Sequence, residues 1–92
     1  MKTLTWNPEK NRWLLQERGV AFEDVVYALQ SNGLLDDLKH PNREKYPDQR
    51  LMVIELDGYA WLVPYVENES ELFLKTIFPS RKATRDYLKR QS

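Results

Sequence analysis

The segment 81–90, RKATRDYLKR, carries five cationic side chains and a single acidic one. Ser80 is a good helix cap, so Arg81, Lys82 and Arg85 are expected at the start of a helix. A helix N-terminus already carries about half a positive charge, and each exposed cation there costs roughly 0.3–1 kcal/mol. Unpaired N–H groups and arginines at one place are good ligands for phosphate. The segment therefore predicts a phosphate site, and the alternative is an ordinary solvated surface.

Other kinds of chemistry find little support in the residue types. The chain has no cysteine and one histidine, His40. The acidic residues near it lack the spacing of a metal site, and solvation of a loop explains them better. The three glycines are scattered, and no serine has a neighbouring histidine to activate it. We therefore expect no metal and no cofactor. The nearby acidic residues are Asp36, Asp37, Glu44 and Asp48.

Length and composition indicate one small domain over residues 1–92. Hydrophobic residues make up 41% and charged residues 30%, which argues against disorder. Fourteen basic and fourteen acidic residues give a net charge of zero, so anion binding would have to use a local patch. The N-terminus lacks a signal-peptide core, and the longest apolar run, AWLVPYV, is too short to span a bilayer. We expect a cytoplasmic protein without membrane contact.

The first half of the chain predicts a strand, two helices and a second short strand. Residues 3–6 have the composition of a strand, and Asn7 followed by Pro8 is a helix start. Gly19 ends this helix, and a second amphipathic helix follows and ends near Gly33. Residues 34–40 are consistent with a short strand, and the polar stretch after them reads as a loop.

The second half predicts a β-meander. The runs RLMVIEL and YAWLVPYVE flank Asp57-Gly58, which is the pattern of a tight two-residue hairpin. LFLKTIF supplies a third antiparallel strand, ended at Pro79. Pro64 lacks an N–H group for the ladder, so we expect a bulge or an edge there. The fold class is α+β, in the order β-α-α-(β)-β-β-β-α, with helices against one face of an antiparallel meander sheet.

This hairpin places a second cation, Arg50, in the sheet. A two-residue turn at Asp57-Gly58 puts Arg50 opposite Tyr65, on the same face as Trp61. A slip of one residue would move Arg50 to the other face. Arg50 is then either part of an anion site or the partner of a carboxylate.

Two parts of the chain resemble the BrnT family of bacterial toxins. TWNPEKNRWLLQERGVAFEDVVYAL is similar to the family's opening, and RLMVIELDGYAWLVPYVENESELFLKTIFPSRKATRDYL is similar to its second half. The chain departs from the family at Arg18, where a histidine is usual, at Ala21, where a small polar cap is usual, and at Pro79. The residues that match are Trp6, Lys10, Asn11, Gly19, Arg50, Ser80, Arg81, Thr84 and Arg85.

The resemblance implies a RelE-like fold and a role in a type II toxin–antitoxin system. Such toxins are small ribonucleases that arrest growth, and an antitoxin, of ribbon-helix-helix type in BrnT pairs, neutralises them in a hetero-oligomer. RNA, either free or as ribosome-bound mRNA, would be the substrate. Non-enzymatic members of the fold form the alternative, either a gyrase poison or a protein that binds only its partner and operator.

The implied chemistry uses the ribose 2′-hydroxyl as nucleophile and needs no metal. Arg81 and Arg85 would clamp the phosphate with Arg50 supporting them, and Tyr65 or Lys75 would move protons. Further contacts with RNA would come from Lys10, Lys82, Trp61, Ser80 and Thr84.

Overall fold

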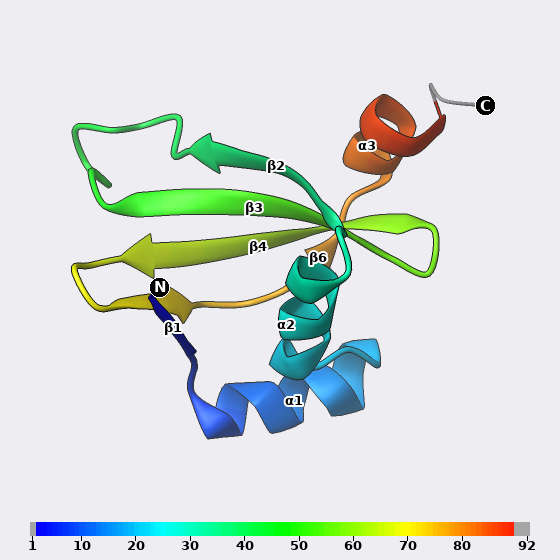
Figure 1. The fold of residues 1–92 in the computed structure, drawn as a ribbon, viewed down its shortest axis with the longest axis horizontal. Helices are drawn as coiled ribbons and strands as arrows, with labels where there is room; N and C mark the ends of the chain where they lie inside the picture. Colours follow the sequence, from blue (N-terminus) through cyan, green and yellow to red (C-terminus); the bar gives the residue numbers. More distant parts are fainter. Residues whose placement is uncertain (1, 90–92) are drawn as a thin grey trace.

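The computed structural model describes residues 2–89 and has an α+β architecture (Figure 1). Arg90, the last cation of the basic segment, lies outside the described residues. The expected order of elements is confirmed, including the short strand before the polar loop. The elements are β1 (Thr3–Thr5), α1 (Pro8–Arg18), α2 (Phe22–Gln30), β2 (Leu34–Lys39), β3 (Gln49–Leu56), β4 (Tyr59–Glu67), β5 (Glu71–Leu74), β6 (Phe78–Pro79), α3 (Arg81–Ala83) and a π-helical turn, η1 (Thr84–Leu88).

The strands form one mixed sheet in the order β1-β5-β4-β3-β2, with β6 paired to β4. The meander β3-β4-β5 is antiparallel, as the sequence predicts, and β2 extends it through antiparallel pairing with β3. The expectation of a purely antiparallel sheet is wrong, because β1 joins β5 in parallel, with Thr3 opposite Glu71. Two segments far apart in the chain, the N-terminus and the end of the meander, therefore share an edge of the sheet (Figure 1).

The third meander strand is broken, in contrast to the single strand predicted over residues 72–78. Leu74 pairs with Tyr65, and Phe78 pairs with Leu62. Between these two pairs the chain advances by four residues from β5 to β6 but by only three residues along β4, so β5 and β6 contain one extra residue. Pro64 lies opposite this break and has no N–H group to donate. It still accepts a hydrogen bond from the Lys75 N–H at 2.8 Å. The bulge expected at Pro64 is thus in the neighbouring segment.

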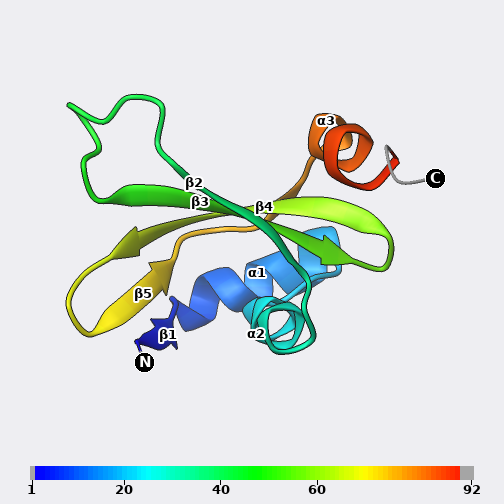
Figure 2. The ribbon, with the colours of Figure 1, turned by 45° about the horizontal axis from the view of Figure 1, so that its top comes forward.

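Helices cover both faces of the sheet, and the expectation of one covered face is wrong (Figure 2). Helices α1 and α2 pack on one side, here called the α1–α2 face, and α3 with η1 packs on the other, the α3 face. The main core lies under α1 and α2. Its fully buried large side chains each contribute about 1.5–3 kcal/mol through burial. They include Leu14, Phe22, Val25, Ile54, Val63, Leu74 and Ile77.

Side-chain caps define the helix ends. The Asn7 Oδ1 accepts hydrogen bonds from the N–H groups of Glu9 (2.8 Å) and Lys10 (3.1 Å), as its position before Pro8 predicts. Gly19 ends α1 with φ of 70°, in the left-handed region.

Helix α2 has Ala21 at its cap position, so its cap comes from elsewhere. The Asn11 Oδ1 in α1 accepts the Phe22 N–H at 2.6 Å, and the Asn11 Nδ2 donates to Glu23 Oε1 at 2.8 Å. The Asp24 carboxylate accepts the Ala21 N–H at 2.8 Å. Asn11 in α1 and the pair Phe22–Glu23 in α2, all within the stretch that resembles the BrnT opening, therefore join the two helices.

Candidate functional site

The short strand β2 brings two consecutive carboxylates to opposite faces of the sheet, because side chains alternate along a strand. Asp37 is paired with Met52 and lies on the α1–α2 face. Asp36 is paired with Val53 and lies on the α3 face, where the Tyr87 hydroxyl donates to its Oδ2 at 2.5 Å. This hydrogen bond is the main cause of the lowered pKa of Asp36. Each of the two aspartates therefore forms its hydrogen bonds on a different face of the sheet.

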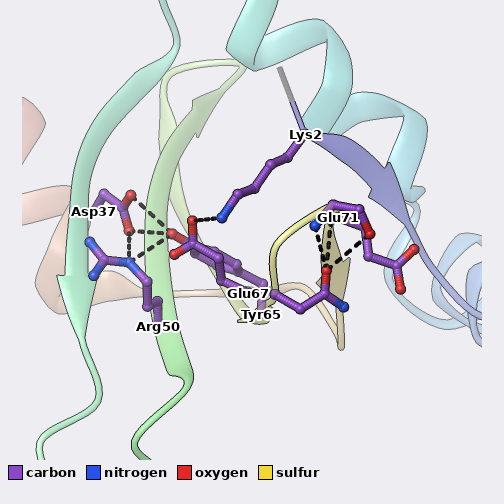
Figure 3. Close-up of polar contacts among 8 residues, drawn as sticks. Lys2, Asp37, Arg50, Tyr65, Glu67 and Glu71 are labelled. Carbon is purple, nitrogen blue, oxygen red and sulfur yellow. Dashed lines mark hydrogen bonds and ion pairs between the residues drawn. The ribbon is translucent and has the colours of Figure 1, made fainter.

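On the α1–α2 face, Asp37 completes a cluster with Arg50 and Tyr65 (Figure 3). Arg50 and Tyr65 are directly opposite each other in β3 and β4, so the register predicted from the hairpin is confirmed. The Arg50 Nε donates to the Tyr65 hydroxyl at 3.0 Å and lies 3.4 Å from Asp37 Oδ1. The Tyr65 hydroxyl donates to the Asp37 carboxylate, at 2.8 Å and 3.0 Å from its two oxygens. Arg50 thus pairs with a carboxylate, the second of the two readings that the sequence left open.

The electrostatics of this cluster keep Tyr65 protonated at neutral pH. Tyr65 is 3% exposed, and burial, followed by its hydrogen bond to Asp37, raises its pKa to about 12. The hydrogen bond to Tyr65 is also the main cause of the raised pKa of Arg50. At neutral pH the Tyr65 hydroxyl therefore keeps its proton and donates it in a hydrogen bond to Asp37, and its oxygen accepts the hydrogen bond from the Arg50 Nε.

The cluster borders an open cavity of about 850 Å³, here called the Arg50 cavity. One wall is apolar and comes from β1, α2 and β5, with Leu4, Val26, Leu29 and Leu72. The rest is polar and includes an ion pair in which Lys2 Nζ lies 2.6 Å from Glu67 Oε2 (Figure 3). This contact is the main cause of the lowered pKa of Glu67. The polar lining consists of Lys2, Gln30, Asp37, Arg50, Tyr65 and Glu67.

Arg50 lines this cavity, and its two terminal nitrogens point away from Tyr65, Glu67 and Lys2 (Figure 3). Only its Nε contacts Tyr65 and Asp37, and no partner among residues 2–89 binds its two terminal nitrogens. These nitrogens carry four N–H groups in a planar arrangement that suits two oxygens of a phosphate or carboxylate.

The basic helix start lies elsewhere. Ala83, in α3, packs against Val53 and Ala60 on the α3 face, so Arg81 and Arg85 do not line the Arg50 cavity. Arg81, Lys82 and Arg85 are exposed, and Arg85 has an exposed contact with Asp86 at 3.4 Å. The structure therefore separates the three arginines that the resemblance brings to one phosphate.

The two hydroxyl groups expected to bind RNA are engaged within the fold. The Ser80 Oγ accepts the Ala83 N–H at 3.0 Å and caps α3. Thr84 is 4% exposed, and its hydroxyl accepts the Ala60 N–H and donates to the Ser80 carbonyl, both at 2.8 Å. Ser80 and Thr84 thus attach the C-terminal helix to the hairpin.

The remaining expected site residues are dispersed. Lys10 lies over the ring of Trp13, 4.2 Å from its centroid. Lys75 is exposed in the break between β5 and β6 and is not part of the Arg50 cavity. Trp61 shares the α1–α2 face with Tyr65 but lines a different cavity, nearer the hairpin turn.

Sequence reasoning missed Asp37, Lys2 and Glu67 as site residues. From the sequence alone, Asp37 is only one of the acids near His40. Its signal was the β2 strand itself, because pairing of LLDDLK with RLMVIE places one of the two aspartates beside Arg50. Among residues 2–89, no group of three or more acidic or histidine side chains is arranged to hold a metal ion. No helix in the same range is long and apolar enough to cross a membrane.

Comparisons with protein-family profiles, curated proteins and solved structures find no match to this chain. The resemblance to BrnT-type toxins thus rests on the sequence motifs quoted above.

Proposed function

We propose that this chain is the toxin of a type II toxin–antitoxin system and a metal-independent endoribonuclease with a RelE-like fold. The observation that carries the proposal is the Arg50 cluster: an arginine on a central strand, held by Tyr65 and Asp37 beside a large cavity, whose terminal N–H groups bind no partner among residues 2–89. The order of elements and the family motifs also support it. In this proposal the protein is cytoplasmic and its partner is an antitoxin of ribbon-helix-helix type.

The proposed reaction divides the work among three side chains. The terminal N–H groups of Arg50 bind the phosphate and stabilise the charge that develops on it in the transition state. The RNA 2′-oxygen forms a bond to phosphorus, and its proton passes to the Asp37 carboxylate. The bond to the 5′-oxygen breaks, and this oxygen takes a proton from solvent. Tyr65 is a positioning residue, because its raised pKa keeps it protonated.

The exposed cations on the α3 face have a separate role in this proposal. Arg81, Lys82 and Arg85 contact phosphates of the same RNA, or of the ribosome that carries it, outside the cavity. Such contacts add affinity and salt dependence without taking part in the reaction.

A second candidate function is a non-enzymatic member of the same fold, such as a gyrase poison or a protein that binds only its partner and operator. The charge of the Arg50 cavity favours it. Arg50 and Lys2 are each balanced by a carboxylate, Asp37 and Glu67, and four leucine or valine side chains share the lining. A neutral, partly apolar cavity suits a polypeptide better than a phosphate chain.

Induction of the protein without a partner in a bacterium tests both candidates. Growth and RNA integrity are followed for the parent, for Arg50→Gln and for a control, Arg12→Gln, which removes an exposed cation from α1. An endoribonuclease arrests growth and cleaves RNA, and cleavage falls about 10²- to 10³-fold in Arg50→Gln only, as expected for loss of a charge-stabilising donor.

The other outcomes separate the candidates. Arrest without RNA cleavage supports the non-enzymatic function, and normal growth with folded protein contradicts a toxin of either kind. Cleavage that EDTA abolishes and Mg²⁺ restores would contradict the metal-independent reaction.

A further inference from the structure

A second cavity lies on the α1–α2 face at the hairpin end of the sheet, and the proposed function does not use it. Its volume is about 640 Å³, within the range of small-molecule sites. We call it the Tyr27 cavity. Its walls come from the α1–α2 junction, the last turns of α2 and the β3–β4 hairpin. They are formed by Gly19, Val20, Asp24, Tyr27, Ser31, Gly33, Glu55, Leu56, Asp57, Tyr59 and Trp61.

Three aromatic side chains from two elements line this cavity. Tyr59 and Trp61 lie on the same face of β4 and are in edge contact, with ring centroids 6.5 Å apart. Tyr27 comes from α2 and is 67% exposed, so its ring is accessible to a ligand. Rings of this kind attract a cation through their negative faces, and several of them around one space are the usual way to bind an organic cation.

Three acidic residues contribute to the lining. Glu55 is paired with Ala60 on the α3 face, so the carboxylates on the side of the cavity are those of Asp24 and Asp57. The cavity has no lysine or arginine in its walls, and among residues 2–89 none forms an ion pair with Asp24, Glu55 or Asp57. Asp24 accepts the Ala21 N–H at 2.8 Å, and Glu55 accepts the Gly58 N–H at 2.7 Å. The first bond fixes the Asp24 carboxylate at the cavity and leaves its negative charge in place, and the second fixes the hairpin turn that carries Asp57.

The spacing of these carboxylates favours an organic cation over a metal ion. They do not form a group able to hold a metal, since a divalent cation requires several oxygens within about 2.0–2.6 Å. A larger cation of low charge density can interact with separated carboxylates and aromatic rings at once. We propose that the Tyr27 cavity binds the ammonium or guanidinium group of an organic cation. This inference is independent of the proposed ribonuclease activity.

Titration of the isotope-labelled protein with n-butylguanidinium, followed by NMR, tests the proposal. The neutral control ligand is n-butylurea, which has nearly the same shape. We expect saturable shifts of the Gly33 and Gly58 amides and of the Trp61 indole N–H with the cation and none with the urea. A parallel titration with N-acetylarginine amide distinguishes two sources of the bound cationic group, a polypeptide side chain and a free small molecule. Tighter binding than butylguanidinium assigns the cavity to a polypeptide side chain, and weaker binding assigns it to a free small molecule.

Two exposed residues serve as test positions because their replacement leaves the core intact. Asp57→Asn removes one charge and keeps a residue that tolerates the left-handed conformation. Tyr27→Ala removes one aromatic wall. Each is expected to weaken binding of butylguanidinium about two- to fivefold, the size of one exposed cation–π or charge contact. Glu69→Gln, in the turn between β4 and β5, is the control and should bind like the parent. Lack of saturation, equal binding of butylurea, or parent-like binding by both variants would overturn the proposal.

Discussion

Tyr65 holds the ion pair of Arg50 and Asp37 together, since its hydroxyl contacts both partners. Replacement by Phe removes this hydroxyl and keeps the ring in the core. We expect Tyr65→Phe to lower the free energy of unfolding by about 1.5–3 kcal/mol, the value of a hydrogen bond to a charged group. RNA cleavage should fall as well, because Arg50 loses its fixed orientation. Urea denaturation and a cleavage assay measure the two effects.

Tyr46→Phe is the matched control, because it removes a tyrosine hydroxyl in the loop between β2 and β3. Stability and cleavage should both stay at the parent's level. An unchanged unfolding free energy in Tyr65→Phe itself would show that the cluster contributes little to the fold.

The raised pKa of Tyr65 gives stability a defined pH dependence. The folded protein holds this proton up to a pKa of about 12, while the unfolded chain releases it near the ordinary value of 10.0. The contribution of Tyr65 to stability is therefore complete below pH 10 and is lost as the pH rises from 10 to 12. Two pKa units correspond to roughly 3 kcal/mol. Ultraviolet titration of the parent minus Tyr65→Phe should show one phenol ionising near pH 12, and ionisation near 10 would contradict the burial argument.

Among the elements, the β3–β4 turn requires two adjacent residues in the left-handed backbone conformation. Asp57 and Gly58 have φ values of 54° and 79°, so both are left-handed, and no atom lies within 4 Å of a Cβ placed on Gly58. We expect Gly58→Ala to lower stability by about 1–2 kcal/mol, because alanine disfavours the left-handed backbone conformation. A steric clash of the new Cβ is not the cause. Gly58→Asn should cost less, because asparagine tolerates the left-handed region. Thermal unfolding compares the two, and equal losses would contradict the conformational explanation.

At the junction of α1 and α2, the Asn11 side chain of α1 binds the start of α2. It caps α2 through the Phe22 N–H and also contacts Glu23. We expect Asn11→Ala to lower stability by about 0.5–2 kcal/mol, as for loss of an N-cap. Asn11→Asp keeps the acceptor and should recover part of this loss at most, because it places a second negative charge beside Glu23. Urea denaturation of both variants is the measurement, and a neutral Asn11→Ala would show that α2 does not need this cap.

At the scale of the whole molecule, the sheet separates two cationic groups. Arg50 lies on the α1–α2 face and Arg81 starts the helix on the α3 face. Residues so placed share no partner, and their effects on stability should add to within about 0.5 kcal/mol. We expect Arg50→Gln to lower cleavage about 10²- to 10³-fold, and Arg81→Gln to weaken RNA binding and its salt dependence.

A double-mutant cycle of Arg50→Gln and Arg81→Gln tests this separation. Additive effects on RNA binding and on unfolding agree with two independent surfaces. A coupling free energy well above 0.5 kcal/mol would show that both arginines hold one phosphate, as the resemblance alone implied.

The sequence by itself determined the features that depend on near neighbours. Asn7-Pro8 and Gly19 set the ends of α1, and Asp57-Gly58 set the tight turn. Because a two-residue turn leaves no freedom in the pairing, it also placed Arg50 opposite Tyr65. Each of these follows from the conformational preference of a few adjacent residues.

The tertiary structure alone decided which distant segments meet. The parallel pairing of β1 with β5 and the position of α3 on the opposite face join segments far apart in the chain. Asp37 reaches Arg50 only because β2 returns to β3 across the loop of residues 40–48. No local propensity encodes such contacts, because they are selected by how whole apolar faces pack together. For this reason the sequence found Arg50 and Tyr65 but missed the carboxylate that holds them.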